Sequence, residues 1–298
     1  MAIFTGSAVA IVTPFNDDLT INFPQFRKLI DFQINNHTDC IVVCGTTGEA
    51  STLTDDEQLE CIRTAVEHVN HRVPVVAGAG SNDTKHGIEL SKRAASLGVD
   101  GLLQVTPYYN KTTQKGLIEH FAAIASSVDV PIILYNVPGR TSLNITPKTA
   151  AELSKIDNIV ALKDASGNIS QTIETVNRCE GRLDIYSGND DQIVPLLSLG
   201  SLGVISVVAN ILPKDTHDIV DLYFKGDLKG SLKLQLKMLH LINALFCEVN
   251  PIPVKAALSF MGPDFDAGIG RMPLTTMEPD HIELLRNEML HYGLSLTD

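Results

Sequence analysis

VPVVAGAG, residues 73–80, is apolar on both of the faces that an extended strand presents. VPIILYNV, residues 130–137, repeats the pattern. Strands that are apolar on both faces need cover on both sides, and this is how strands lie in a parallel sheet wrapped by helices. The two stretches therefore predict an α/β protein built on a parallel sheet.

Similar apolar runs recur about every 20 to 30 residues, and each is followed by an amphipathic segment of helical length. Eight strands are predicted, at Ala8–Thr13, Cys40–Cys44, Val73–Gly78, Gly101–Thr106, Pro131–Asn136, Ile159–Lys163, Leu183–Ser187 and Val204–Val208. The helices predicted between and after them are Pro24–Asn35, Asp55–Val69, Thr84–Ser96, Lys115–Ser126, Pro147–Ser154, Ser170–Cys179, Asp190–Leu199 and Lys214–Phe224. Thr54 and Glu57 have the spacing of a capping box for the second helix.

Eight strand–helix units in about 225 residues fit a (β/α)8 TIM barrel. A doubly wound open sheet is the alternative, but its first strand is usually followed by a glycine-rich phosphate loop, and here TPFNDD follows. Beyond Phe224 the sequence predicts helices alone, at Leu228–Phe246, Pro253–Phe260 and Pro279–His291. We expect a barrel over residues 1–225 and a C-terminal helical appendage over residues 226–298.

Composition limits the classes of function. The chain has 298 residues and a net charge of −12, which argues against nucleic acid or an anionic membrane as partner. It has no apolar run of membrane-spanning length and no signal peptide pattern, so a cytoplasmic location is expected. Its five cysteines form no CxxC pair, which predicts reduced thiols packed as small hydrophobic groups.

Barrel enzymes carry their chemistry at the carboxyl ends of the strands. The predicted strand ends are followed by CGTTGE, TPYYN, YNVPGR, LKDASGN and SGNDD. Lys163 lies four residues into its strand and Tyr135 four residues into the strand before it, so the two side chains should lie at similar heights on neighbouring strands.

A lysine inside a barrel is poorly solvated, which lowers its pKa towards about 7 to 8 and leaves a neutral, nucleophilic amine. Such an amine forms a Schiff base with a ketone or aldehyde. The alternative is a lysine that is ion-paired with Asp164 or with a core carboxylate, and strand alternation places Asp164 on the opposite face.

GTTGE, TPYYN, YNVPGR and VALKDASGN, in this order and spacing, resemble the dihydrodipicolinate synthase family of the pyruvate-dependent, lysine Schiff-base aldolase superfamily. The likeness runs from GSAVAIVTPF through GVISVVAN to NPIPVKAAL and RMPL. It implies condensation of pyruvate with aspartate-4-semialdehyde in the synthesis of diaminopimelate and lysine. It also implies a homotetramer built as a dimer of dimers.

The resemblance implies a role for each matching residue. Lys163 would form the Schiff base with pyruvate, and Tyr135 would donate and accept protons beside it. Thr46 and Tyr109 would complete a chain of hydroxyls to solvent, with Tyr109 entering from the neighbouring subunit. Hydroxyl groups suit such a relay because each can give one proton while it accepts another.

Both substrates are anions, so an acidic chain must hold them through local contacts. The glycine-flanked GTTGE turn can direct backbone N–H groups and the Thr47 hydroxyl at a carboxylate, and in the family it holds that of pyruvate. Arg140 follows the fifth strand and is the candidate for the carboxylate of the semialdehyde. Gly188 and Ile205 match positions whose backbones line the pyruvate pocket.

Other chemistries have little support. His68 and His71 have no HExxH spacing, so no metal site is expected, and no nucleotide fingerprint indicates a cofactor. Two alternatives remain open: a sister aldolase acting on N-acetylneuraminate or 2-keto-3-deoxygluconate, and a non-catalytic barrel that binds a keto acid. The Thr46, Tyr109 and Arg140 set favours the synthase over the first, and the retained nucleophile argues against the second.

Family members that are inhibited by lysine bind it near the GTTGE loop. The corresponding positions here are Ala50, Asp55, Gln58, Asn82, His86 and Tyr108. Ala50, Asp55, Gln58 and His86 depart from the residues of inhibited members, and a glutamate that would pair with the ligand's ammonium group is lost. Asp55 could replace that charge only by pointing inward, but it is expected in the first turn of a helix, where the dipole favours a carboxylate, so we predict weak or absent inhibition.

Overall fold

The computed structural model describes residues 2–297 and contains one closed barrel of eight parallel strands, in the order of the sequence. The strands are β1 (Gly6–Ala10), β2 (Cys40–Val43), β3 (Val75–Gly78), β4 (Gly101–Val105), β5 (Ile132–Asn136), β6 (Ile159–Asp164), β7 (Asp184–Ser187) and β8 (Gly203–Ser206). The predicted TIM barrel is confirmed. The strand that differs most is β1, which starts earlier than predicted because Gly6 pairs with Gly203 of β8 and closes the barrel.

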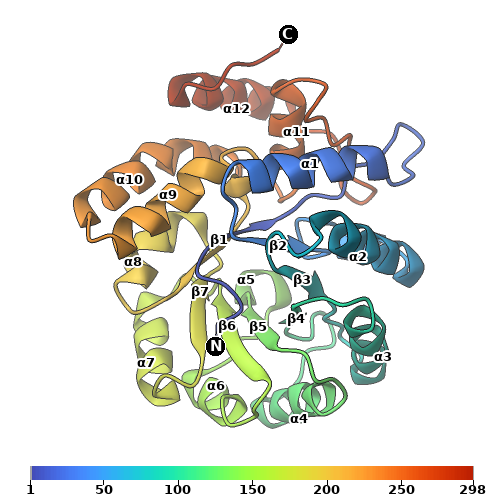
Figure 1. Cartoon of the computed structure of the whole chain (residues 1–298), viewed down its shortest axis with the longest axis vertical. Coiled ribbons are helices and arrows are strands. Elements are labelled where there is room, and N and C mark those ends of the chain that lie inside the picture. Colours follow the sequence, from blue (N-terminus) through green and yellow to red (C-terminus); the bar gives the residue numbers. More distant parts are fainter. Residues whose placement is uncertain (1, 298) are drawn as a thin grey trace.

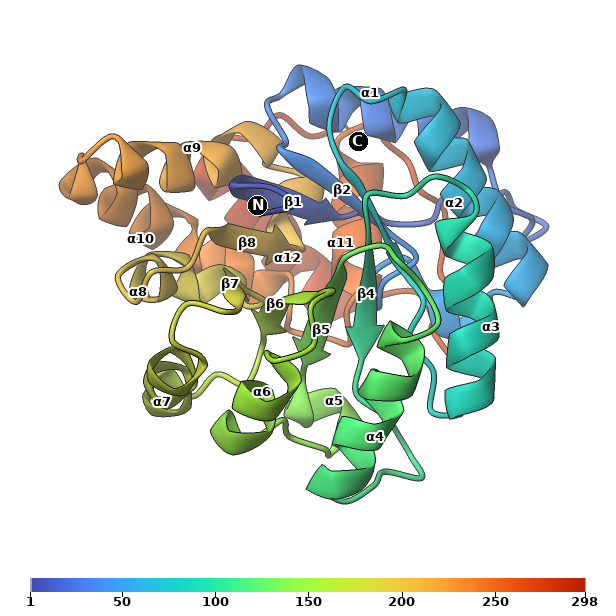
Figure 2. The same ribbon diagram turned by 60° about the horizontal axis from the view of Figure 1, so that its bottom comes forward.

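A ring of helices surrounds the barrel (Figures 1 and 2). These helices are α1 (Phe23–Asn35), α2 (Asp55–Val69), α3 (Thr84–Ala95), α4 (Gln114–Ala125), α5 (Pro138–Thr141), α6 (Pro147–Leu153), α7 (Ile169–Cys179), α8 (Ile193–Leu197) and α9 (Pro213–Phe224). Single 3-10 turns lie at η1 (Ala50–Thr52), η2 (Asp190–Gln192) and η3 (Val208–Asn210). The capping box of α2 is present, because the Glu57 N–H donates to Thr54 Oγ1 and the Thr54 N–H to Glu57 Oε2.

Two local features differ from the sequence prediction. The helix predicted over Asp190–Leu199 is divided into η2 and α8. The Asp190 carboxylate is held by backbone N–H groups that follow β8, which fixes η2 apart from the start of the α-helix. The short helix α5 was not predicted, since YNVPGR shows only a proline that can begin a helix.

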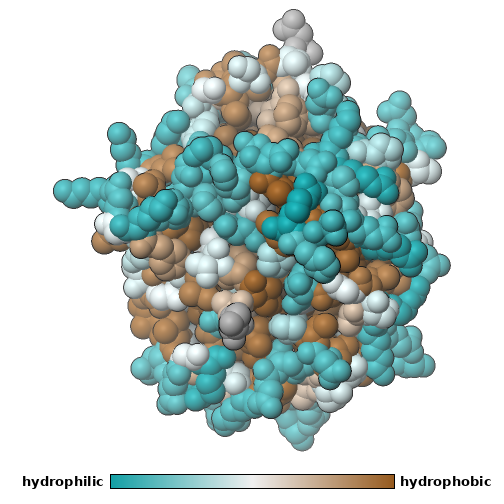
Figure 3. All heavy atoms as spheres, in the orientation of Figure 1, coloured by the Kyte–Doolittle hydropathy of each residue, from teal (hydrophilic) through white to brown (hydrophobic). Residues whose placement is uncertain are grey.

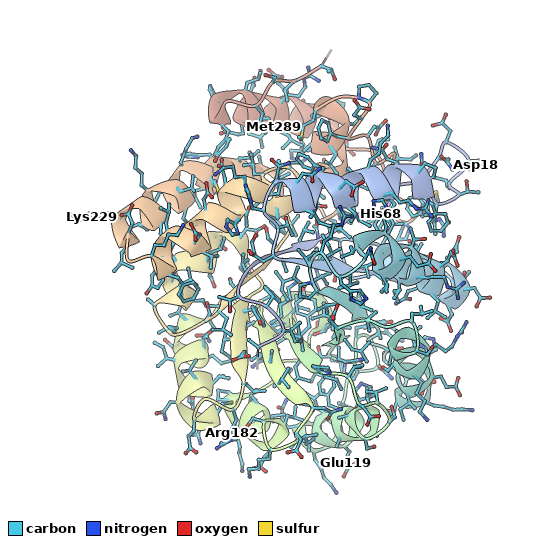
Figure 4. All side chains as sticks on the ribbon, in the orientation of Figure 1. Asp18, His68, Glu119, Arg182, Lys229 and Met289 are labelled. Carbon is cyan, nitrogen blue, oxygen red and sulfur yellow. The ribbon has the colours of Figure 1, made fainter. Side chains whose placement is uncertain are left out.

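The C-terminal helices α10 (Leu228–Ala244), α11 (Ile252–Phe260) and α12 (Pro279–Tyr292) follow the barrel. Helix α10 lies along α9, and α12 packs on α10 and α11 (Figure 1). Figure 4 labels Met289 on α12, and this side chain is fully buried, so α12 is anchored to the rest of the fold. Among the described helices, none combines the length and the apolar character that crossing a membrane requires.

Small and aliphatic side chains fill the barrel interior, including Ala8, Val42 and Ile133. At its amino-terminal end the ring of Phe4 stacks on that of Tyr186, with 4.2 Å between the centroids. The Tyr186 hydroxyl donates to the Phe4 carbonyl oxygen at 2.6 Å. Tyr186 is the register partner of Lys163 on β7, so the aromatic pair joins the strand next to that lysine to the segment before β1.

Candidate active site

Lys163 and Tyr135 are direct neighbours in the barrel. They are register partners on β6 and β5, and the lysine Nζ lies 4.2 Å from the centroid of the tyrosine ring. The equal height predicted from the sequence is confirmed. Asp164 lies on the other face, where its carboxylate accepts a hydrogen bond from Thr172 Oγ1 of α7 at 2.6 Å. The alternative of a Lys163–Asp164 ion pair is therefore excluded.

Burial controls the acidity of both groups. Lys163 is only 6% exposed, and this burial lowers the pKa of its ammonium group to about 8, with Asp190 acting to raise it and Arg140 to lower it. Burial raises the pKa of Tyr135, against opposing effects of Arg140 and the Thr46 hydroxyl. At neutral pH the site therefore holds a phenol and a lysine that readily gives up its proton.

The GTTGE loop follows β2 and has a strained backbone. Cys44 and Glu49 both adopt positive φ angles, of 55° and 57°, which side-chain-bearing residues rarely do. Gly78 of β3 lets the loop approach closely, because a Cβ atom there would lie 2.0 Å from the Cys44 carbonyl oxygen. Such a loop has a fixed shape before any substrate binds.

The two threonines of this loop face different surroundings. Thr47 is buried, and its Oγ1 accepts a hydrogen bond from Asn250 Nδ2 at 3.0 Å. Thr46 is exposed and lies beside Tyr135 on the wall of a cavity. The structure thus brings Thr46 to Tyr135, as the relay requires, and ties Thr47 to the C-terminal region.

Arg140 lies on α5 at the rim of the barrel, exposed to solvent. Its Nη2 donates to the Asn250 carbonyl oxygen at 3.4 Å. Asn250 Oδ1 is buried and has no hydrogen-bond partner in the part of the chain that the structure describes. Sequence reasoning gave Asn250 no role, although it begins the NPIPVKAAL motif, and the structure shows it linking Arg140 to Thr47.

Gly188 and Ile205 lie at the ends of β7 and β8. The Gly188 N–H donates to the Asp164 carbonyl oxygen at 2.8 Å, and a Cβ atom at this residue would lie 2.7 Å from that of Ala165. Ile205 is buried in the barrel interior in the same cluster as Tyr135. Both residues are therefore in the barrel mouth, close to the chain segments that carry Lys163.

Tyr109 is a predicted catalytic residue that does not line the cavity of its own chain. Its side chain is 92% exposed and its φ is 69°. Tyr108, by contrast, is less exposed and lines the cavity beside Tyr135. Within one chain, Tyr109 is not among the residues that line the cavity with Thr46 and Tyr135, and the hydroxyl relay stays a prediction.

A cavity of about 430 Å³ opens from the barrel mouth. One end is lined by Thr46, Tyr135 and Arg140, and the other by Asp55 and His86. Asp55 lies in the first turn of α2, as predicted, and it also takes the inward-facing orientation that the sequence indicated as less favoured. Its carboxylate faces the cavity and both oxygens lie 3.0 Å from His86 Nε2, because this first-turn position of α2 points towards α3.

Two ion pairs attach the GTTGE loop and α2 to the C-terminal region. Lys255 Nζ of α11 lies 2.7 Å from Glu49 Oε1, and both side chains are buried. Arg271 pairs with Glu57 at 2.6 Å, which lowers the pKa of the glutamate to about 2. The Arg271 backbone N–H also donates to Glu49 Oε2 at 2.9 Å. The C-terminal helical region thus supports the GTTGE loop.

The described residues offer no group of side chains that could bind a metal ion. Within residues 2–297, no three or more histidine, cysteine, aspartate or glutamate side chains gather closely enough to hold a metal ion. The chemistry available here is that of a buried amine, a phenol, a hydroxyl and a guanidinium group.

Comparison with known proteins agrees with this geometry. The model of the dihydrodipicolinate synthetase family matches residues 3–291. A 4-hydroxy-tetrahydrodipicolinate synthase from Lachnoclostridium phytofermentans is 61% identical over 99% of this chain and 100% of its own. The pyruvate complex of the chloride-inhibited dihydrodipicolinate synthase from Acinetobacter baumannii superposes with a TM-score of 0.94, at 44% identity over 97% of this chain and 99% of its own. The lysine-bound enzyme from Cyanidioschyzon merolae gives 0.95, at 39% identity over 99% and 100%.

Proposed function

Because the chain belongs to the dihydrodipicolinate synthetase family and condenses pyruvate with aspartate-4-semialdehyde, we propose that Lys163 is the nucleophile of this reaction. The enzyme is a lyase of the class I aldolase type, and its product is 4-hydroxy-tetrahydrodipicolinate, a precursor of diaminopimelate and lysine. The observation that carries the proposal is the buried Lys163 amine, which lies against Tyr135 at the barrel mouth.

The first half of the reaction forms a carbon nucleophile. The neutral Lys163 amine attacks the keto carbon of pyruvate, and the oxygen leaves as water once it has been protonated. The resulting cationic Schiff base draws electrons from the adjacent methyl group, which loses a proton and becomes an enamine. Tyr135 is the group that gives and takes these protons, because its phenol is neutral and lies beside the amine.

The second half joins the two substrates. The enamine carbon attacks the aldehyde carbon of the semialdehyde, and the new alkoxide takes a proton through Tyr135 and Thr46. The amino group of the semialdehyde then attacks the Schiff-base carbon, which closes the ring and releases Lys163. Arg140 holds the carboxylate of the semialdehyde at the rim, and the GTTGE loop with Thr47 holds that of pyruvate. Gly188 and Ile205 line the pyruvate pocket.

Covalent trapping tests the nucleophile. Pyruvate plus borohydride should attach a stable label to Lys163, located by peptide mass mapping, and Lys163→Ala should take none. A label on a different lysine would refute the assignment. Consumption of pyruvate together with aspartate-4-semialdehyde, with N-acetylneuraminate left intact, distinguishes the synthase from a sister aldolase.

We also propose a cytoplasmic homotetramer, built as a dimer of dimers. Tyr109 is exposed in one chain and would reach the relay of its neighbour. On α10, Leu228, Leu232 and Leu236 recur every four residues and are all exposed, as one apolar stripe. Figure 3 shows further apolar atoms reaching the surface along its left edge, over α7 and α8. A second contact between copies would cover such surfaces.

A further inference from the structure

Asp190 is a buried carboxylate that takes no part in the proton transfers and substrate contacts proposed above. It begins η2, directly after β7, and is only 3% exposed. Its Oδ2 accepts hydrogen bonds from the backbone N–H groups of Val207 and Val208, at 3.1 and 2.9 Å. Its Oδ1 is also buried but finds no hydrogen-bond partner among the described residues. The backbone thus holds the carboxylate in place through Oδ2, while Oδ1 is buried without a hydrogen bond.

The position of Asp190 relates it to Lys163. The lysine is on β6, and Asp190 follows β7, the next strand of the barrel. Asp190 is the acidic group whose charge acts on the Lys163 ammonium, and Arg140 of α5 is the cation that opposes it. The other titratable neighbours are Tyr135 of β5 and Tyr186 of β7, whose hydroxyl is bonded to Phe4.

The remaining neighbours do not neutralise Asp190. The Ser206 hydroxyl of β8 lies beside its carboxylate, and Gln235 of α10 contacts only its backbone oxygen, at 3.2 Å. Asp164 of β6 points out of the barrel. Burial raises the pKa of Asp190, and Lys163 is the cation whose charge acts to lower it.

We propose that Asp190 is a positioning residue, the buried counter-charge that stabilises the cationic Schiff base formed on Lys163. This inference rests on the proposed function, because it needs a Schiff base at Lys163. Asp190 itself does not touch the reacting atoms. It acts through Lys163, and its two backbone hydrogen bonds hold its charge in place.

The chemistry explains why a fixed anion is useful there. The amine that attacks pyruvate is neutral, whereas the Schiff base that follows is a cation in a poorly solvated barrel. An isolated cation in such surroundings is costly, and a fixed negative charge nearby offsets part of that cost. Since the protonated amine and the protonated Schiff base carry the same charge, Asp190 favours the Schiff base only where the free amine is neutral.

Asp190→Asn tests the counter-charge. The amide oxygen can still accept the two backbone hydrogen bonds, so the variant removes the charge and keeps the shape. With the anion gone, the pKa of Lys163 falls, and the pH profile of borohydride trapping moves to lower pH by about one unit. Above that range the KM for pyruvate rises about tenfold, because the Schiff base is less stable. Asp191→Asn, at an exposed neighbour, is the control and should leave both unchanged.

The outcomes separate the two proposals. If the parent protein takes no label on Lys163, the proposed function fails. If it is labelled but Asp190→Asn keeps the parent pH profile, the Asp190 proposal fails alone. Should Asp190→Asn not fold, infrared difference spectra of the parent protein with and without pyruvate supply the test. We expect an ionised buried carboxylate in the complex, and a protonated one would overturn the proposal.

Discussion

Glu49 and Lys255 form a buried ion pair of 2.7 Å although 206 positions separate them in the sequence. Glu49 belongs to the GTTGE loop, and Lys255 belongs to α11. The lysine Nζ also lies 4.2 Å from the centroid of the Phe15 ring and donates to the Ile269 carbonyl oxygen at 3.2 Å. The GTTGE loop is therefore held in shape by the C-terminal helical region.

Lys255→Met should destabilise the protein by about 3 to 5 kcal/mol, because it leaves the charge of Glu49 buried without a cationic partner. Denaturant unfolding measures this change. Lys229→Met removes an exposed lysine of α10, labelled in Figure 4, and should have little effect. The double variant Glu49→Gln, Lys255→Met should recover part of the loss. A single variant as stable as the parent would contradict the expected dependence on the pair.

Trapping of pyruvate should depend on pH through Lys163. Since the pKa of this ammonium group is lowered to about 8, the neutral amine is absent at low pH and grows as pH rises through that value. The trapping rate should rise about tenfold from pH 6 to pH 7 and level off above about pH 9. Single-turnover measurements across this range give the profile. A midpoint near the ordinary lysine pKa would show that burial does not tune the amine.

Arg140→Ala should raise the KM for aspartate-4-semialdehyde by about ten- to a hundredfold, because a charge-assisted hydrogen bond contributes about 1.5 to 3 kcal/mol. The KM for pyruvate should change much less. Steady-state kinetics with each substrate varied in turn separates the two. Arg178→Ala, which removes only an exposed pair with Glu174, is the matched control. Equal loss for both substrates would assign Arg140 to general positioning of the rim.

Tyr109→Phe should lower turnover, because it removes one hydroxyl from the proposed relay. It should also weaken association between subunits if the ring crosses the interface. Turnover assays and analytical ultracentrifugation measure the two effects. Tyr223→Phe, on α9, is a control at a tyrosine far along the chain from the relay. Full activity in a monomeric Tyr109→Phe protein would refute the cross-subunit role.

L-Lysine should inhibit the enzyme weakly or not at all. Inhibition should be weak because the Asp55 carboxylate, although it faces the cavity, is already in contact with His86 through both of its oxygens. An incoming ammonium group must compete with that contact. Initial rates across a lysine titration decide the matter. Half-inhibition at sub-millimolar lysine, lost in Asp55→Ala, would show instead that Asp55 serves as the ammonium receptor.

The barrel and its central residue pair were predictable because both depend on local patterns. Runs such as VPIILYNV identify strands through their own composition, and counting along two strands put Lys163 and Tyr135 at one height. Neither step needs knowledge of distant contacts. The predicted strand boundaries were less exact where hydrogen bonding to a neighbouring strand sets them. Gly6, for example, belongs to β1 because it pairs with Gly203 of β8.

The supporting residues were missed because their roles arise from long-range contacts. Asn250 reaches Thr47 across 203 positions, and no local pattern records such a contact. Lys255 did carry a signal: it is a lone lysine in the apolar segment Ile252–Phe260, as Lys163 is in its strand. Asp190 stood in SGNDD at a strand end, but burial and the free Oδ1 distinguish it from Asp191 only in three dimensions.

The stacked rings of Phe4 and Tyr186 close the barrel at its amino-terminal end, opposite the cavity at its mouth. With Lys163 as the proposed nucleophile, pyruvate has to bind before the semialdehyde, because the semialdehyde reacts with the enamine that pyruvate forms. The water released when the Schiff base forms would leave through the barrel mouth, where the semialdehyde enters. Both substrates then use the same opening at the barrel mouth. An excess of semialdehyde that binds at the rim before pyruvate would block pyruvate and slow the enzyme.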